Sequence, residues 1–424
     1  MDTLVFFNII NNDKCSGAAW DAVVAPRSGK PLWDVPLASL GNVNTDVGAA
    51  QEAFRSWKQT AVEQRKALLS KIIGQETGKS TLMSDLEVDD CISFVTFNAA
   101  QSLEDEVAFQ DETLKIINTH QPLGVVAAIF PWNFPLVLAM GKIAAGLVTG
   151  NCFVELASQV LPPGVLQELN GGGDVGAMLV KHRTVQKVSF TGSTAAGKRI
   201  MESASGTLKR ITLELGGNDG CIVCHDVDVQ SVAREVAVGC FFHSGQMCLA
   251  TKRIYVRRDV YALFLSQFLR EFAVVKSLIE DCEHNDYEIL AGGTKGMGKG
   301  LWIPPTVVNN PPDDSRIVKE EQFGPIIPLL TWDTEEEVIR RVNNTDCGLG
   351  ASMCAKDQER AQRLARSLDM SSIWVNHFPK PVPMGHLSSW KESGFGGEWG
   401  RAGLLAYCQV QTLQVYKSKA REYM

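Results

Sequence analysis

The alternation of buried strands with helices is the sequence feature that most limits how this chain can fold. Residues 124–129, Gly-Val-Val-Ala-Ala-Ile, form a continuous apolar run, which is typical of a parallel strand covered on both faces. A helix is expected at residues 136–148, and further strands are expected at 151–154 and 187–190. Because strands that alternate with helices build a parallel sheet, this part of the sequence predicts an α/β domain.

The same alternation begins again at Gly220. Strands are predicted at residues 221–223 and 254–256, with a helix at 229–242 between them. Three later elements repeat the order of strand, helix and strand: 352–354, 357–368 and 373–376. The sequence therefore predicts two doubly wound parallel-sheet domains, with a hinge near Glu214–Gly217.

Composition and charge are those of an ordinary soluble enzyme. The chain has 424 residues, of which 45% are hydrophobic and 21% are charged, and its net charge is −7. No run of Lys or Arg marks a surface for nucleic acid or membrane, and no apolar run is long enough to span a bilayer. Leu4–Phe7 lacks a preceding basic region, so it is predicted as a strand and not as a signal peptide. The eleven cysteines lack framework spacing, so we expect reduced thiols and a cytoplasmic protein.

The segment Phe241–Ala250 contains the residue best suited to covalent chemistry. Within it, Cys248 lies close to a glycine and a glutamine. Glu214 lies upstream in the motif Leu-Glu-Leu-Gly-Gly-Asn, and Asn133 lies in Pro-Trp-Asn-Phe-Pro. A thiol that forms a covalent intermediate needs a base for the later attack of water and donors for an oxyanion. These three residues supply a nucleophile, a base and a donor.

Each of the three residues also has an ordinary structural explanation. Cys248 could be one more buried cysteine among the eleven, and Glu214 could be a charge facing solvent at the end of a strand. Asn133 could cap the helix that begins near Phe134. The tight turn beside Cys248 favours the catalytic interpretation, because a buried structural thiol needs no such neighbours.

Taken together, the three motifs resemble those of the aldehyde dehydrogenase superfamily, and the resemblance extends over residues 24–415. It implies that Cys248 attacks an aldehyde to give a thiohemiacetal and that hydride transfer then leaves a thioester. It further implies that Glu214 activates the water that hydrolyses this thioester. Asn133 and the backbone N–H of Cys248 would stabilise the oxyanion. Lys142 resembles a lysine near the family's active site, although a solvated helix charge explains it equally well.

A dinucleotide site belongs to the same resemblance. Residues 190–197 follow a predicted strand and open a helix, whose backbone N–H groups and dipole can hold a pyrophosphate. Their spacing differs from the GxGxxG fingerprint but matches the family's own variant. Glu321 could instead be a surface acid, and Phe323 a core aromatic. The resemblance implies NAD or NADP, no metal, and cofactor contacts at Trp132, Gly192, Ser193, Thr194, Gly197, Leu215, Glu321 and Phe323.

The resemblance also implies how the chain is divided and assembled. The segments 112–120 and 409–415 alternate in polarity and are predicted as exposed strands. In the family such strands form an arm that pairs with another subunit, so we expect a homodimer or homotetramer. The expected divisions are a Rossmann-like cofactor domain (1–102 and 119–213), a catalytic thiol domain (214–398) and a small β oligomerisation arm (103–118 and 399–424).

The chain departs from the family just after Val154. There the family has a Lys-Pro-Ser-Glu-like stretch and a helix, which bind the adenosine ribose, whereas this chain leads directly to Pro162-Pro163-Gly164. A crossover between parallel strands needs about a dozen or more residues. We therefore expect weakened dinucleotide binding and no readable preference between NAD and NADP. Two further segments, near residues 69–79 and 272–275, are also shorter than in the family.

Three functions are compatible with these features. An NAD(P)-dependent dehydrogenase that oxidises an aldehyde to a carboxylic acid is favoured by the intact Cys248, Glu214 and Asn133. A catalytically impaired homologue with a structural or regulatory role is favoured by the missing ribose segment. A thiol esterase would need no cofactor. The sequence does not identify the small-molecule aldehyde, although Gly141 stands where many relatives carry a bulky side chain and so indicates a roomy pocket.

Overall fold

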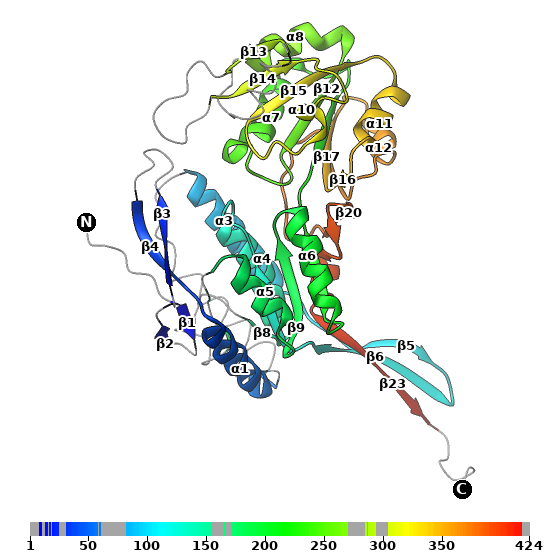
Figure 1. Ribbon diagram of the computed structural model, residues 1–424. Coiled ribbons are helices and arrows are strands. Elements are labelled where there is room, and N and C mark those ends of the chain that lie inside the picture. Colours follow the sequence, from blue (N-terminus) through cyan, green and yellow to red (C-terminus); the bar gives the residue numbers. More distant parts are fainter. Residues whose placement is uncertain are drawn as a thin grey trace.

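Two α/β domains and a projecting β arm make up the computed structural model of the chain (Figure 1). The N-terminal strand predicted at Leu4–Phe7, and the three segments predicted to be short, lie outside the residues that the structure describes. Those residues are 8–10, 13–15, 17, 19–24, 31–57, 59–60, 82–153, 165–166, 169, 171–269, 285, 287–293 and 304–417.

The first domain is built on a five-stranded sheet with the order β21-β10-β9-β7-β8. β21 runs antiparallel to β10, and all other neighbours are parallel. The apolar run at 124–129 forms β7, so the predicted buried parallel strand is confirmed. The strands are β7 (Val125–Ile129), β8 (Cys152–Phe153), β9 (Val185–Thr191), β10 (Arg210–Glu214) and β21 (Gly394–Phe395).

Helices of the first domain pack against this sheet and against one another. They are α1 (Leu40–Trp57), α3 (Leu82–Ala99), α4 (Pro135–Val148), α5 (Gly173–Lys181) and α6 (Thr194–Ser205). α4 begins with a proline, which suits the first helical turn. Its free N–H groups are satisfied by α3, because the Glu87 carboxylate accepts from the backbone N–H of Leu136 at 2.8 Å and of Val137 at 3.2 Å. This contact fixes α3 beside the start of α4.

The second domain holds a seven-stranded sheet with the order β13-β14-β15-β12-β11-β17-β18. Only β13 is antiparallel to its neighbour. The strands are β11 (Asp219–Val223), β12 (Thr251–Arg257), β13 (Ile289–Ala291), β14 (Thr306–Asn309), β15 (Ile326–Trp332), β17 (Gly350–Cys354) and β18 (Ser372–Val375). The helices are α7 (Val229–Phe241), α8 (Arg258–Phe268), α10 (Arg316–Lys319), α11 (Glu335–Asn343) and α12 (Gln358–Ala365).

An antiparallel sheet forms the arm, in the order β23-β6-β5. It contains β5 (Glu106–Gln110), β6 (Leu114–Pro122) and β23 (Cys408–Tyr416). β23 is exposed at every position but its first, and the arm extends away from both domains in Figure 1. The two exposed strands that the alternating pattern predicts are therefore neighbours, although they are almost 300 positions apart in the chain.

The remaining helices and strands are short, and some of them surround the site. They are β1 (Asn8–Ile10), β2 (Asp13–Cys15), β3 (Ala19–Val24), β4 (Pro31–Leu37), η1 (Phe242–Gly245), β16 (Cys347–Gly348), β19 (Leu387–Ser388), β20 (Trp390–Lys391), β22 (Gly397–Glu398) and α13 (Gly400–Leu405). Among the described helices, none is both long enough and apolar enough to cross a membrane.

A separate apolar cluster lies where the two domains meet. It contains Phe94 from α3, Trp399 from the C-terminal segment, and Leu249 from the turn after α7, together with Leu349 and Leu387. Burying a side chain of this size contributes roughly 1.5–3 kcal/mol, so the cluster helps to fix one domain against the other. The predicted catalytic cysteine is adjacent to it in sequence and packs against it.

Candidate active site

Cys248 follows a turn that requires unusual backbone angles. His243, Ser244 and Gly245, in η1, have φ of 49°, 57° and 71°. A residue other than glycine in this left-handed region costs about 1–3 kcal/mol. A Cβ on Gly245 would lie 2.5 Å from the carbonyl oxygen of Gly324, so the turn needs glycine at that position. The strained turn ends α7 and places the thiol between the two domains.

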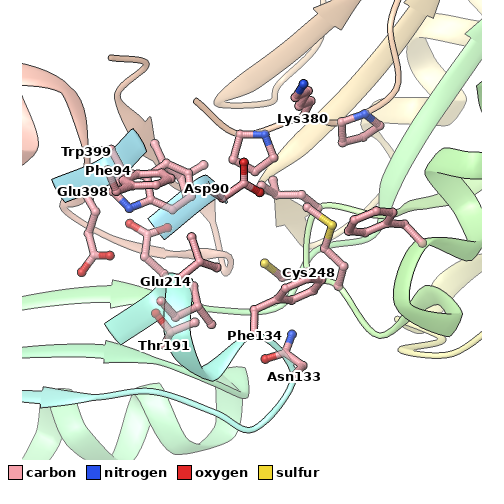
Figure 2. Close-up of a pocket in the computed structure, with 18 of the residues that line it drawn as sticks. Asp90, Phe94, Asn133, Phe134, Thr191, Glu214, Cys248, Lys380, Glu398 and Trp399 are labelled. Atoms are coloured by element: carbon pink, nitrogen blue, oxygen red, sulfur yellow. The ribbon is translucent and has the colours of Figure 1, made fainter. Parts of the chain in front are cut away.

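A cavity of about 380 Å³ brings the predicted catalytic residues together (Figure 2). Cys248 reaches it from the turn before β12, Glu214 from the end of β10, and Asn133 from the loop before α4. Three segments that are distant in sequence thus converge on one space. Much of the wall is apolar, and its largest side chains are aromatic: Phe94, Phe134, Phe242, Phe378 and Trp399.

The thiol of Cys248 is held in its neutral form. Burial raises its pKa to about 12, and the carboxyl groups of Glu321 and Asp219 add to this effect. The Lys252 ammonium acts in the opposite direction. Because the thiolate is the nucleophilic form, the resting thiol has to lose its proton before it can attack a carbonyl carbon.

Glu214 is a buried carboxyl group with a strongly perturbed acidity. Its side chain is almost fully buried, and its Oε2 accepts a hydrogen bond from Ser389 Oγ at 3.2 Å. Burial, and then the negative charge of Glu398, raise the pKa of Glu214 well above its usual range, while Lys142 lowers it. Glu214 is therefore not a charge facing solvent, and a carboxylate of raised pKa is well matched to accept a proton from water.

Lys142 lies beneath the cavity and not on a solvated face. It is fully buried, and its Nζ is 2.7 Å from Oε1 of the equally buried Glu398. Ser189 Oγ donates to the same carboxylate oxygen. The alternative of a solvated helix charge is therefore wrong for Lys142. Its ammonium instead stabilises the charge of two buried carboxyl groups. It contacts Glu398 directly, and it acts on Glu214 by electrostatic attraction at longer range.

Asn133 connects the loop before α4 with the turn that carries Cys248. Its Nδ2 donates to the carbonyl oxygen of Gln246 at 2.9 Å, and its side chain is 6% exposed. α4 has Phe134 as its N-cap residue and no side-chain cap hydrogen bond, so Asn133 does not cap that helix. Since a side-chain amide has two N–H donors, the second one remains available to a group in the cavity.

Several residues predicted to bind a cofactor lie outside the cavity lining and contact one another or nearby backbone. Glu321 is half-buried, accepts from the backbone N–H of Gly217 at 3.1 Å, and has its pKa raised by burial. The rings of Trp132 and Phe323 meet edge to face with centroids 6.2 Å apart. Lys252 Nζ lies 5.4 Å from the Phe323 ring centroid. Glu321 is thus not a surface acid, and Trp132 is 64% exposed and open to a ligand.

The remaining predicted cofactor residues surround the start of α6. Ser193 is the N-cap, and its Oγ accepts from the backbone N–H of Ala196. A Cβ on Gly197 would lie 2.5 Å from Leu215, so this glycine allows helix and strand to pack closely. Gly192 and Thr194 flank the cap. The first turn of α6 follows the carboxyl end of a parallel strand, which is where α/β proteins place phosphate groups.

Comparison with known proteins decides the family. A family model described as the aldehyde dehydrogenase family matches residues 16–276 and 269–413. This chain belongs to the aldehyde dehydrogenase family. It is 36% identical to a putative aldehyde dehydrogenase, FUS7, of Gibberella moniliformis, covering 97% of this chain and 99% of that protein. It is 31% identical to retinaldehyde dehydrogenase 3 of Homo sapiens, covering 97% and 93%. The chain is therefore an enzyme that oxidises aldehydes with NAD or NADP.

Solved structures agree with the fold of this aldehyde dehydrogenase. An aldehyde dehydrogenase from Bacillus cereus, solved as an NAD⁺ complex, superposes with a TM-score of 0.89 at 27% identity and covers 97% of this chain and 96% of its own. An NADP-dependent enzyme of E. coli gives 0.90 at 25% identity, with 97% and 98% covered. The predicted α/β fold is confirmed. The alignment with FUS7 runs over 457 positions, more than the 424 residues of this chain, so it includes positions at which this chain has no residue.

Sequence reasoning missed three residues beside the site of this aldehyde dehydrogenase. Glu398, Ser389 and Trp399 all come from the C-terminal segment, which β21 and β22 return to the end of β10. No spacing rule connects them with Glu214, because the connection exists only in the folded chain. The one local signal is that Glu398 is an acid flanked by Gly397 and a tryptophan.

Proposed function

We propose that this aldehyde dehydrogenase works through a thioester on Cys248, with Glu214 as the base for hydrolysis and Asn133 as an oxyanion donor. The supporting observation is that a thiol, a buried carboxyl group and a free amide N–H line one cavity. In this scheme the Cys248 thiolate forms a bond to the aldehyde carbon, and loss of hydride from that carbon leaves a thioester. A water that gives its proton to Glu214 then releases the carboxylic acid and the thiol.

The residues beside the cavity fit a nicotinamide dinucleotide. Small residues and free backbone N–H groups open α6 at the carboxyl edge of the sheet, and Trp132 and Phe323 offer flat apolar faces. Glu321 has one oxygen on Gly217 N–H and a second oxygen that suits a ribose hydroxyl. When bound, the dinucleotide supplies the acceptor for hydride. These side chains and backbone groups bind the dinucleotide and orient it beside Cys248.

Lys142 and Glu398 influence the pKa of Glu214, the proposed base. Lys142 contacts Glu398 directly, and both Lys142 and Lys187 favour the carboxylate form of Glu214, but burial and the charge of Glu398 outweigh them. This arrangement keeps Glu214 basic, which favours uptake of the proton of the attacking water. Lys142 therefore acts through Glu214 and Glu398 and makes no bond to the substrate.

We also infer that the arm pairs with another copy of the chain, giving the expected homodimer or homotetramer in the cytoplasm. The inference is supported by large apolar side chains left exposed on β5 and β23, which a soluble monomer seldom carries as a group. Light scattering after size-exclusion chromatography measures the mass directly, and a monomer would contradict the inference. The exposed side chains are Val107, Phe109, Val410, Leu413, Val415 and Tyr416.

The thiol assignment is tested by Cys248→Ala. This variant should lose both the aldehyde-dependent formation of reduced cofactor and the hydrolysis of p-nitrophenyl acetate, since both reactions use the same acyl thiol. Cys15→Ala is the matched control, because Cys15 is a half-buried thiol in β2 that does not line the cavity. If iodoacetamide labels another cysteine as activity falls, the assignment to Cys248 is wrong.

A further inference from the structure

Four residues that line the cavity have a buried polar atom without a partner among the residues that the structure describes. The atoms are Asn133 Oδ1, Thr191 Oγ1, Glu214 Oε1 and the indole nitrogen Nε1 of Trp399, and the indole N–H is the one group among them that can only donate. Trp399 is 8% exposed and Glu214 is 4% exposed, and both line the cavity. Their chemistry is complementary, since an indole N–H can only donate and a carboxylate can only accept. Buried polar groups in folded proteins almost always have a partner, so this pair calls for an explanation.

The backbone holds the Trp399 side chain in place at some strain. Trp399 directly follows Glu398, which is fixed by its ion pair with Lys142. Its φ and ψ are 59° and 171°, a combination that is close to a region occupied essentially by glycine alone. Its ring packs edge to face on Phe94 with centroids 4.8 Å apart. Figure 2 shows the indole of Trp399 and the Glu214 carboxyl on the same side of the cavity.

A glycine on the facing helix makes room for the indole nitrogen. A Cβ on Gly141 in α4 would lie 2.8 Å from Nε1 of Trp399. Any side chain at position 141 would therefore displace the indole N–H. Gly141 is not one of the residues that line the cavity, and the space beside it is occupied by the indole nitrogen of Trp399.

We propose that Trp399 is a positioning residue for Glu214, and that its indole N–H donates a hydrogen bond to the Glu214 carboxylate during hydrolysis of the thioester. Glu214 already accepts from Ser389 through Oε2, so the indole would fix the second oxygen and with it the orientation of the base. The proposal rests on the proposed function, since it assigns a partner to the base of that mechanism. It requires no new covalent step.

The charged groups around Glu214 determine the expected pH effect. Glu398 disfavours the carboxylate form of Glu214, whereas Lys142, Lys187 and the Ser389 hydroxyl favour it. An N–H donated by Trp399 also favours the carboxylate. Removing that donor should raise the pKa of Glu214 further, so that the rise of the hydrolysis rate with pH moves to higher pH.

Trp399→Phe is the direct test, because it keeps an aromatic ring against Phe94 and removes the donor. Hydrogen bonds to charged groups are strong enough that their loss should slow thioester hydrolysis by about ten- to a hundredfold. Stopped-flow mixing with aldehyde and NAD or NADP should give a rapid burst of reduced cofactor followed by slow turnover. The rate of the burst should change little. Gly141→Ala leaves Trp399 in the chain but displaces its N–H, so it should reproduce the slow hydrolysis.

Phe94→Leu is the matched control for the cavity wall. It removes the ring that packs on Trp399 and leaves the indole N–H in place, so it should alter the KM for aldehydes and leave the pH midpoint of hydrolysis unchanged. Hydrolysis of p-nitrophenyl acetate needs no cofactor, so it tests Trp399 even if no aldehyde is oxidised. Failure of aldehyde oxidation in the wild type would count against the proposed function alone. Unchanged hydrolysis rates and pH midpoints in both Trp399→Phe and Gly141→Ala would overturn the role of Trp399.

Discussion

At the scale of single residues, the acidity of Glu214 governs how the enzyme should respond to pH. Burial and the neighbouring Glu398 raise its pKa, and only the ionised carboxylate can accept a proton from water. The hydrolysis step should therefore slow as the pH falls through this raised pKa and reach a plateau above it. Single-turnover rates of thioester hydrolysis, measured from acid to alkaline pH, test this. In Glu214→Gln the rise with pH should disappear, and an unchanged profile would remove Glu214 from the mechanism.

The buried pair Lys142 and Glu398 makes a second prediction at this scale. Removing one partner of a buried ion pair leaves an uncompensated charge and costs about 3–5 kcal/mol. Lys142→Met should therefore lower the midpoint of urea unfolding sharply. The double variant Lys142→Met with Glu398→Gln removes both charges and should recover much of the loss. If the single and double variants unfold at the same midpoint, the two side chains are not coupled.

At the scale of elements, the sequence predicts features that depend on neighbouring residues, but it does not predict contacts between segments that are distant in the chain. The motifs around Cys248, Glu214 and Asn133 are local patterns, so they could be found without a structure. The apolar run at 124–129 is also a local pattern, and it correctly predicted the strand β7. Glu398 could not be found, because its partner Lys142 is 256 positions away and only the return of the C-terminal segment joins them.

The role of the left-handed turn η1 can be tested by substituting its glycine. Gly245 has φ of +71°, and a Cβ there would collide with the carbonyl oxygen of Gly324. Gly245→Ala should destabilise the protein by more than about 1 kcal/mol and reduce the rate of Cys248 alkylation by iodoacetamide. Gly48→Ala is the control, since Gly48 lies in α1 with nothing within 4 Å of its added Cβ, and alanine favours a helix by about 1 kcal/mol. Equal effects of the two variants would argue against a role for the turn.

At the scale of the whole molecule, the shortened segment after Val154 should weaken cofactor binding. The start of α6 and Glu321 are present, but the Lys-Pro-Ser-Glu-like stretch for the adenosine ribose is missing from the sequence. Losing two hydrogen bonds of this kind weakens binding by roughly 3–6 kcal/mol, or about two to four powers of ten. Calorimetric titration with NAD and with NADP measures this. Micromolar binding of either would show that other residues replace the lost contacts.

In the proposed mechanism, one cavity holds an acyl group on Cys248, and Glu214 activates the water that removes it. The most direct measurement is mass spectrometry of Glu214→Gln after rapid mixing with an aldehyde and cofactor and quenching in acid. We expect the peptide containing Cys248 to gain the mass of the acyl group and to keep it for many wild-type turnovers. An acyl group on a different residue, or reduced cofactor formed with no acyl group on the protein, would rule out a thioester on Cys248.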